Sequence, residues 1–520
     1  NASAIATGHY IGDTGNFGNT LYTGYPVTGA NGAPITFQED DLLLGDLTAH
    51  FGGNYLNETS LIAAARQAGY ATAVMGKVGP IAIQDITQRD GTGTIVIDDA
   101  LNTPKGITVS PEINDAIKAA GISATAPKTN VPNTAQQQYL IAVATKVVLP
   151  KLAASGHPFA MLYWSRDPDA SQHSAKDSFG KLSPGINSAS GRAGIKDADD
   201  TLAALLAALK AQGLDKTTDV FVTADHGFST IDRHSKTSAA GKISYPKVIP
   251  GETPPGVVAI DLADALAMPI YDPFNQNSPV DYKSGQLSSF GSAVLGADPA
   301  NPDIVVVANG GSDHIYLPGA NARDLAPKIV DALSKEDYIS GIFVDDALGS
   351  VPGALPMSAI NLRGSALTPQ PSIIVSFASH PIPGCKPLLM CAAEMADTSL
   401  DTGQGMHGSF SRADTRNFMA ATGPDFKARF ADPAPVSNAD INPTLAHILG
   451  LDIPSKGNLK GRVASEALKG GKKVTVTKGW QASMPAPNGQ KTVLEYQRVG
   501  GTRYFDSAGF PGRTVGLSPH

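Results

Sequence analysis

Two short apolar runs, each followed closely by an aspartate and a histidine, constrain the fold of this chain most. The runs are FAMLYWS (159–165) and DVFVT (219–223), and both have the length and composition of buried strands. The residues that follow them are Asp169 and His173 in DPDASQH, and Asp225 and His226 in TADHGF. Because the carboxyl ends of parallel strands border one crevice in an open sheet, we expect these side chains to share a site.

Helix and strand signals alternate along the rest of the chain. The segment TSLIAAARQAGY (59–70) predicts a helix, and ATAVMG directly after it predicts a strand. DADDTLAALLAALKAQGL (197–214) predicts a second helix, because leucines 202, 205, 206 and 209 recur at i, i+3, i+4 and i+7. This order predicts an α/β fold with a central, mostly parallel sheet flanked by helices.

A third motif, GMHGSF, adds His407 to the four polar residues after the strands. Carboxylates and imidazoles suit zinc, and one Zn²⁺ takes three or four protein ligands. Five candidates are too many for one ion, but two ions about 4 Å apart would use them and could clamp both oxygens of a phosphoryl displacement. Any one of these residues alone would be an ordinary loop side chain.

The three motifs resemble those of the alkaline phosphatase superfamily, and more closely its type I phosphodiesterase and nucleotide pyrophosphatase branch. The family's Asp-x-x-x-His, Asp-His-Gly and late His-Gly occur here in the same order. The resemblance implies an alkaline-phosphatase-like fold with two Zn²⁺, which other divalent transition metals could replace. It implies that one zinc is held by Asp169, His173 and His407, and the other by Asp225 and His226.

The beginning of the chain resembles the stretch that follows the nucleophile in this family. In NASAIATGHYIGDTGNFGN, the resemblance makes Thr7-Gly8-His9-Tyr10 a turn and Asn19 a phosphate ligand, whereas the residue types alone equally favour a turn role for Asn19. The nucleophilic Thr or Ser would then stand three residues before Asn1, and a first strand with a metal-binding Asp further upstream. We expect the sequence to be a fragment; the alternative is a natively truncated, inactive protein.

Lys77 in GKVGP is a second candidate for contact with phosphate. The segment resembles the Gly-Lys segment of family monoesterases, in which an Arg follows two residues later, but here that position is Gly79. Arg166 or Arg233 could supply the charge from elsewhere. Because a monoester carries one more negative charge than a diester, the missing Arg favours diesters.

The resemblance therefore implies a phosphoric-ester hydrolase acting through a covalent phospho-Thr or phospho-Ser intermediate on a small phosphate ester. The alternatives are an inactive relative that binds metal or a phosphorylated ligand, and a structural assembly protein. A formal net charge of −7 argues against a nucleic-acid scaffold. The sequence contains no apolar run of roughly 18 residues, and we therefore expect no membrane span in this chain. Oligomerisation remains possible.

The chain contains two cysteines, Cys385 and Cys391. A short disulfide loop in an oxidising compartment is the preferred interpretation, with two free thiols as the alternative, and it favours a periplasmic or secreted location.

The long interval of 181 positions between His226 and His407 predicts an inserted subdomain. We divide the chain into a first part of the core (1–235), an inserted cap (236–360), a second part of the core (361–471) and a β-hairpin tail (472–520). In the tail, Gly500-Gly501 is predicted to turn the hairpin between LEYQRV and TRYFD.

Overall fold

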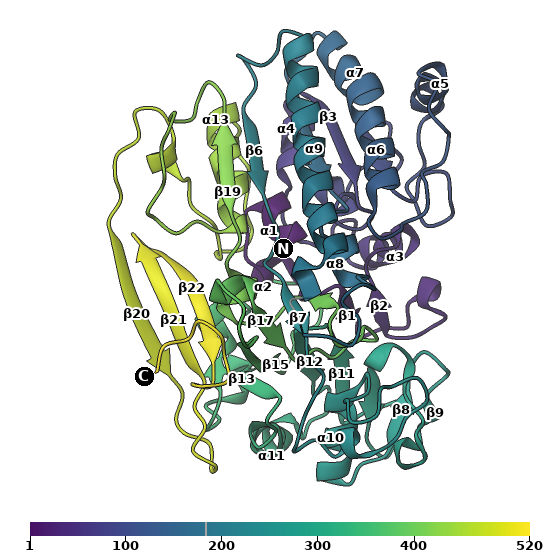
Figure 1. Cartoon of the computed structure of the whole chain (residues 1–520), viewed down its shortest axis with the longest axis vertical. Helices are drawn as coiled ribbons and strands as arrows, with labels where there is room; N and C mark the ends of the chain where they lie inside the picture. The colour runs from purple at the N-terminus through teal and green to yellow at the C-terminus, as the bar shows by residue number, and fades with distance from the viewer. Residues whose placement is uncertain (183–184, 520) are drawn as a thin grey trace.

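The computed structural model describes residues 1–182 and 185–519, and it confirms an α/β fold with a parallel sheet (Figure 1). The middle strand of that sheet is β3 (Ala71–Gly76), which pairs in parallel with β4 (Thr94–Asp98) and with β5 (Phe159–Trp164). Gly76 pairs with the last residue of both neighbours, so the three strands end at one level. The two strands predicted from ATAVMG and FAMLYW are thus present.

A group of helices covers one face of this sheet (Figure 1). They are α6 (Thr134–Val143), a π-helical segment (Ala144–Val148), α7 (Leu149–Ala154) and α9 (Ala189–Ala211). α9 begins eight residues before the predicted start, because the side chain of Ser188 accepts a hydrogen bond from the backbone N–H of Gly191 and caps it there. Its predicted leucine face is unevenly buried: Leu209 is buried, whereas Leu206 is 38% exposed.

The remaining helices of this half are α3 (Asp41–His50), α4 (Leu61–Gln67), α5 (Pro111–Ala119) and α8 (Asp169–His173). α4 is the helix predicted over 59–70, and Ser60 caps its start by accepting from the backbone N–H of Ala63. Its buried residues pack between β3 and the N-terminal helix α1 (Ala2–Thr7).

The strand predicted from DVFVT is β6 (Val220–Thr223), and it pairs antiparallel with β19 (Met419–Thr422). Within the described residues, β5 pairs only with β3 and β6 only with β19. All residues of β5 and β6 are partly exposed despite their apolar character. The parallel sheet therefore comprises β4, β3 and β5, and β6 stands apart from it with an antiparallel partner.

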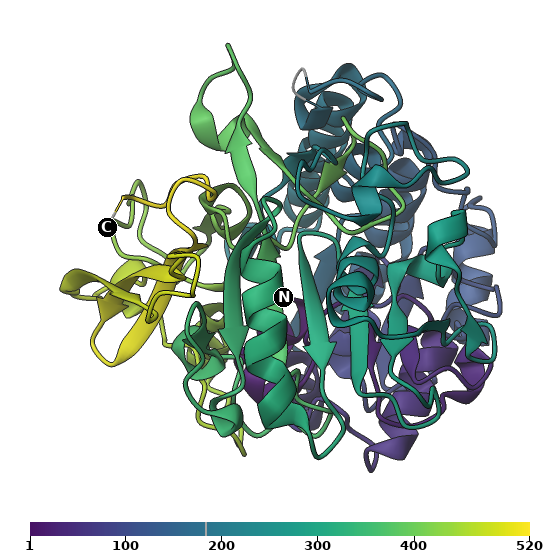
Figure 2. The same cartoon turned by 90° about the horizontal axis from the view of Figure 1, so that it is seen from below.

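A second, eight-stranded sheet fills the lower half of the molecule and is mostly antiparallel (Figures 1 and 2). Its order is β14-β13-β15-β12-β11-β10-β8-β9, and α10 (Val257–Leu266) and α11 (Ala322–Ser334) pack against it in one apolar core. The strands are β8 (Ile270–Asp272), β9 (Ser278–Pro279), β10 (Ala293–Leu295), β11 (Ile304–Ala308), β12 (Ser312–Tyr316), β13 (Ile339–Val344), β14 (Leu355–Pro356) and β15 (Ile373–Phe377). Because the sheet takes strands from both sides of residue 360, the domain division remains a prediction.

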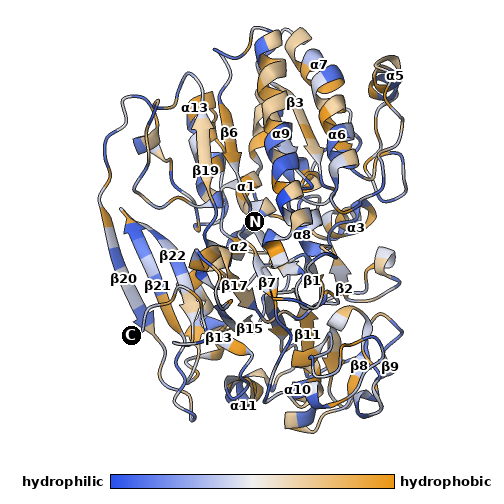
Figure 3. Ribbon diagram, in the orientation of Figure 1, coloured by the Kyte–Doolittle hydropathy of each residue, from blue (hydrophilic) through white to orange (hydrophobic). Residues whose placement is uncertain are grey.

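Two smaller sheets complete the framework. One has the order β16-β17-β7-β18, with β16 (Ser379–Pro381), β17 (Ala392–Glu394), β7 (Ser229–Ile231) and β18 (Gly405–Met406). The other is antiparallel and contains β20 (Val476–Ala482), β21 (Val493–Val499) and β22 (Thr502–Gly509). Val499 pairs with Thr502, which confirms the hairpin turn at Gly500-Gly501. The hydropathy colouring shows this sheet as more hydrophilic than β3 (Figure 3).

The other elements lie around these sheets. They are α2 (Ile11–Thr14), β1 (Thr20–Tyr22), β2 (Ile35–Phe37), α12 (Arg412–Thr415) and α13 (Ile441–Leu449), together with short 3₁₀ turns. None of the helices in the described ranges has both the length and the apolar character that crossing a bilayer requires.

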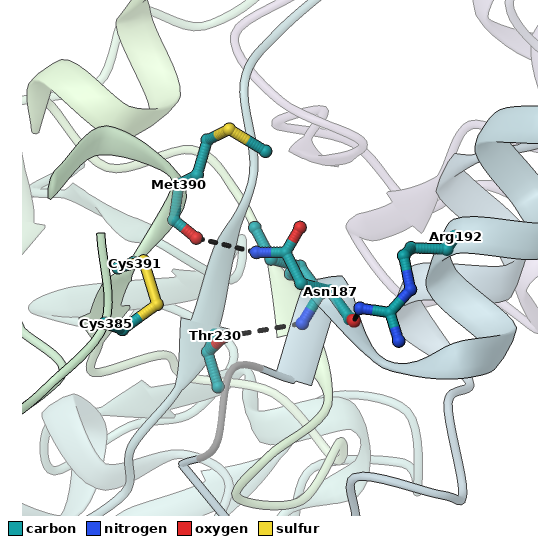
Figure 4. Close-up of a disulfide and its surroundings, with 7 residues drawn as sticks. Asn187, Arg192, Thr230, Cys385, Met390 and Cys391 are labelled. Atoms are coloured by element: carbon teal, nitrogen blue, oxygen red, sulfur yellow. Dashed lines mark hydrogen bonds between the residues drawn. A yellow bond between two sulfur atoms is a disulfide. The ribbon is translucent and has the colours of Figure 1, made fainter. Parts of the chain in front are cut away.

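The two cysteines form a disulfide, as the sequence predicted (Figure 4). The loop that it closes lies beside Asn187, whose side-chain amide donates to the backbone carbonyl of Met390 at 2.8 Å. The backbone N–H of Ile186 in turn donates to the hydroxyl of Thr230 on β7 at 3.4 Å. The disulfide loop is therefore linked to the small sheet that carries β7 and β18.

Candidate metal centre and pocket

The first motif lies on a single helical turn. α8 begins at Asp169 and ends at His173, and these two residues stand at i and i+4 on one face. Nε2 of His173 is 3.2 Å from Oδ1 of Asp169. The spacing Asp-x-x-x-His thus places a carboxylate and an imidazole side by side.

The second and third motifs are brought together by strand pairing. Asp225 and His226 follow β6, and the chain then continues into β7. β7 pairs antiparallel with β18, which ends directly before His407. This pairing stacks the His226 and His407 rings, with centroids 3.5 Å apart and planes 17° apart, although 181 positions separate the two residues.

Five side chains from the three motifs converge around Asp169. Nε2 of His407 and Nε2 of His226 lie 3.8 and 3.9 Å from Oδ1 of Asp169. Oδ2 of Asp225 lies 3.2 Å from Nε2 of His226, and the rings of His173 and His407 are 5.2 Å apart. The structure therefore brings together all five residues that the motifs singled out.

Backbone carbonyls orient two of the imidazoles. Nδ1 of His173 is 2.8 Å from the carbonyl oxygen of Gly405, and Nδ1 of His226 is 2.8 Å from that of Gly227. With Nδ1 bonded to a carbonyl, each ring presents Nε2 to the cluster. Metal-binding histidines are commonly held in this way.

The charge state of the cluster follows from burial and close charges. Burial alone would raise the pKa of the Asp169 carboxyl, but Lys77, His173 and His407 hold that pKa well below its usual range. Burial and the neighbouring His226 and His173 lower the pKa of His407 well below its ordinary value. Asp169 and His407 are thus in the protonation state that metal ligation requires. For His226, burial lowers the pKa, but Asp225 and Asp169 outweigh it and raise that pKa.

This donor set fits a transition metal. Oδ1 of Asp169 is buried and makes no hydrogen bond within the described part of the chain, although three imidazole nitrogens surround it. An unsatisfied buried carboxylate oxygen is costly, and a cation between it and the imidazoles would remove that cost. Two carboxylates and three imidazoles are ligands that zinc prefers.

A pocket of about 850 Å³ opens next to the cluster. Asp225, His226 and His407 line it, and so do the two predicted phosphate ligands, Asn19 and Lys77. Other parts of its wall come from β21, β22 and the eight-stranded sheet with its loops, including Gln497, Tyr504, His314 on β12 and Asn309 directly after β11. Each predicted site residue therefore lies either in the cluster or on the wall of the adjacent pocket.

The Nζ of Lys77 is held between two carboxylates. It lies 2.6 Å from Oε1 of Glu39 and 3.2 Å from Oδ2 of Asp169. Arg166 also contacts Glu39: its Nη1 lies 3.6 Å from Oε2 of Glu39 and 3.2 Å from Oδ2 of Asp99.

Arg233, the other arginine considered as a source of charge, points elsewhere. It is buried, and its Nη1 donates to the carbonyl oxygen of Leu400 at 2.8 Å. It is not among the residues that line the pocket.

Three residues at the site were not anticipated from the sequence. Glu39 carries no motif, and its relation to Lys77 depends on a contact across 38 positions. His314 lies on β12 and lines the pocket, and burial lowers its pKa to about 4. Asn1 also lines the pocket. Only the polar alternation of SDHIY could have drawn attention to His314.

Comparison with known proteins agrees with the motifs. Residues 1–243 match the family model described as type I phosphodiesterase / nucleotide pyrophosphatase. No curated protein matches the chain. A solved structure of murine ectonucleotide pyrophosphatase/phosphodiesterase 5 aligns at 14% identity and a TM-score of 0.46, covering 88% of this chain and 85% of that chain.

Two further structures give similar values. An inactive form of the murine protein in complex with AMP aligns at 14% identity and a TM-score of 0.47, covering 90% of this chain and 87% of that one. The human protein aligns at 15% identity and a TM-score of 0.44, again covering 90% and 87%. The resemblance drawn from the motifs is thus confirmed over residues 1–243, which match the type I phosphodiesterase/nucleotide pyrophosphatase family and contain four of the five candidate ligands.

Proposed function

We propose that this protein is a two-metal phosphoric-ester hydrolase that cleaves phosphodiesters in preference to phosphomonoesters. The observation that carries the proposal is the convergence of Asp225, His226 and His407 with the α8 pair, Asp169 and His173, at the edge of one pocket. The family match over residues 1–243 supports the same class of reaction.

Within this proposal, the five residues divide into two ligand sets. Asp169, His173 and His407 would hold one Zn²⁺, and Asp225 and His226 the other. Zinc supplies Lewis-acid chemistry: it favours deprotonation of a hydroxyl and neutralises charge on phosphate oxygens. Oδ1 of Asp169 lies near His407, a ligand of the first ion, and also near His226, a ligand of the second. This proximity of the two ligand sets supports two closely spaced ions.

The nucleophile is proposed to be a Thr or Ser three residues before Asn1. Its hydroxyl oxygen would bond to phosphorus as one alcohol leaves with the hydroxyl proton, and water would then release the phosphomonoester from this covalent intermediate and restore the hydroxyl. Asn1 lines the same pocket as Asp225 and His226, which supports this assignment because residues just before Asn1 would also lie near the cluster.

The roles of the pocket residues follow from their chemistry. The side-chain amide of Asn19 would donate to a non-bridging oxygen of the substrate. Lys77 would act mainly on the cluster, since its ammonium group already pairs with Asp169 and Glu39. A pocket of about 850 Å³ leaves space for the two organic groups of a diester.

The proposed location is periplasmic or secreted. The disulfide between Cys385 and Cys391 supports it, because such bonds persist mainly in oxidising compartments.

The test measures metal content and hydrolysis on the native, full-length protein. We expect about two zinc ions per chain and cleavage of bis-p-nitrophenyl phosphate. Asp225→Asn and His407→Ala should each lower kcat/KM at least 100-fold, as losing a ligand of a catalytic metal does. His447→Ala is the matched control, because His447 is exposed on α13 and outside the pocket.

Two results would contradict the proposal. One is full diesterase activity in the Asp225 and His407 variants. The other is a native protein that binds no metal and cleaves neither ester, which would favour a binding or structural role.

A further inference from the structure

Glu39 stands at the pocket wall beside Lys77. It is the second residue after β2, its side chain is 14% exposed, and it lines the same pocket as Asn19 and Lys77. Its carboxylate lies 2.6 Å from the ammonium group of Lys77. An acidic side chain at this position is unexpected in a pocket for an anion, since like charges repel.

The backbone at Gly79 allows this placement. Gly79 has a φ of +85°, and a Cβ built there would lie 2.9 Å from the carbonyl oxygen of Gln38 and 3.1 Å from Cα of Glu39. A larger residue at position 79 would therefore displace the segment that carries Glu39. The loop that presents Lys77 and the segment that presents Glu39 are packed directly on each other.

The charges around Lys77 leave no surplus positive charge for the substrate. Lys77 and Arg166 are the two cations, and Glu39, Asp99 and Asp169 are the carboxylates that pair with them. Of these three carboxylates, Glu39 is the one that pairs with both cations and also lines the pocket. Metal bound at Asp169 would take up that carboxylate, and Glu39 would still neutralise Lys77.

We propose that Glu39 determines specificity by disfavouring substrates with a dianionic phosphoryl group. A phosphomonoester carries one more negative charge than a diester and needs a free cation to stabilise it. Glu39 pairs with Lys77 and Arg166 and so withholds both cations from that role. This inference rests on the proposed hydrolase function and assigns its choice of ester to one residue.

The test compares Glu39→Gln with the wild-type protein on p-nitrophenyl phosphate and bis-p-nitrophenyl phosphate, using full-length zinc-loaded protein. We expect the ratio of monoester to diester kcat/KM to rise about tenfold, because one unit charge near the phosphoryl group is removed. Glu39→Asp keeps the charge and should keep the wild-type ratio. Glu112→Gln is the matched control, since Glu112 is 77% exposed on α5 and pairs there with Lys151.

Binding of inorganic phosphate to the zinc-loaded protein, followed by calorimetry, provides a readout that does not need turnover. Glu39→Gln should bind phosphate about tenfold more tightly than the wild type. A purely structural role for Glu39 would instead weaken phosphate binding and lower both activities.

The outcomes separate the two proposals. An active diesterase whose ester ratio and phosphate affinity do not change in Glu39→Gln would overturn the assignment of Glu39 and leave the hydrolase function standing. A wild-type protein that cleaves neither ester contradicts the hydrolase function, and the phosphate-binding comparison then decides the role of Glu39 by itself.

Discussion

Asp13 is a buried carboxylate that joins three distant segments, and its replacement by asparagine should be strongly destabilising. Its Oδ2 accepts from the backbone N–H of Leu459 at 2.7 Å and lies 2.8 Å from Nδ1 of His9, while Oδ1 accepts from the N–H of Ser365 at 3.1 Å. Cβ atoms built at Gly364 and Gly457 would come within 2.3 Å of the carboxyl group. The carboxylate therefore has little room to move.

The magnitude follows from these contacts. In Asp13→Asn one side-chain oxygen becomes an NH₂ group, which faces either the His9 and Leu459 donors or the Ser365 donors. Two charge-assisted hydrogen bonds are lost and a donor is buried against donors, at a cost of about 3–5 kcal/mol. Urea unfolding at pH 7, followed by circular dichroism, measures this cost. Asp200→Asn is the control, because Asp200 is 60% exposed and pairs with Lys196.

The pH dependence provides a second check on Asp13. Burial alone would raise its pKa, but His9 and the backbone N–H groups of Leu459 and Ser365 lower it below the usual value. For a carboxyl group with a depressed folded-state pKa, the contribution to stability is present above the unfolded pKa and lost as pH falls through the folded one. The variant should therefore lose less stability than the wild type between about pH 5 and pH 3. A cost under about 1 kcal/mol, or an unchanged acid limb, would refute the reasoning.

Three further predictions concern the scaffold. Gly76→Ala should lower both the melting temperature and the diesterase activity, because its Cβ would lie 1.9 Å from the β5 carbonyl that also accepts from the N–H of Lys77. A variant that keeps both the wild-type melting temperature and the wild-type activity would contradict this prediction. Burial and Asp414 raise the pKa of Glu394, so wild-type stability should fall as pH rises above about 4.5, and Glu394→Gln should flatten that slope in urea titrations. Replacing Cys385 and Cys391 by serine should cost about 2 kcal/mol, the value expected for a loop this short, as measured by calorimetry.

The parts of the site that depend on residue type and on short-range order in the chain could be predicted from the sequence. Asp169 and His173 are one helical turn apart, and Asp225 directly follows an apolar strand, so their placement needs no knowledge of the rest of the fold. The position of His407 depends on the pairing of β18 with β7, which the motif order anticipated only through resemblance.

Other features depend on contacts that leave little trace in the sequence. The strand partner of β6 is MAAT, whose small residues give weak strand propensity, and β6 was therefore not expected outside the parallel sheet. α9 starts in ASGRAGIK, where glycines hide the helical periodicity and the Ser188 cap sets the start. The role of Glu39 arises only when two loops meet at Gly79.

The hairpin of β21 and β22 forms part of the pocket wall but is separate from the candidate metal ligands. Tyr504 and Gln497 border the pocket, yet their hairpin pairs only with β20 and, within the described chain, contains none of the five candidate ligands. The hairpin is anchored by the phenol of Tyr504, which donates to Asp440 at 2.8 Å and accepts from Arg462 at 2.7 Å, and by Leu494 and Ala508, which pack in one apolar core with β13. Changes in this hairpin could therefore reshape what the pocket admits while the ligands that would perform the chemistry stay in place.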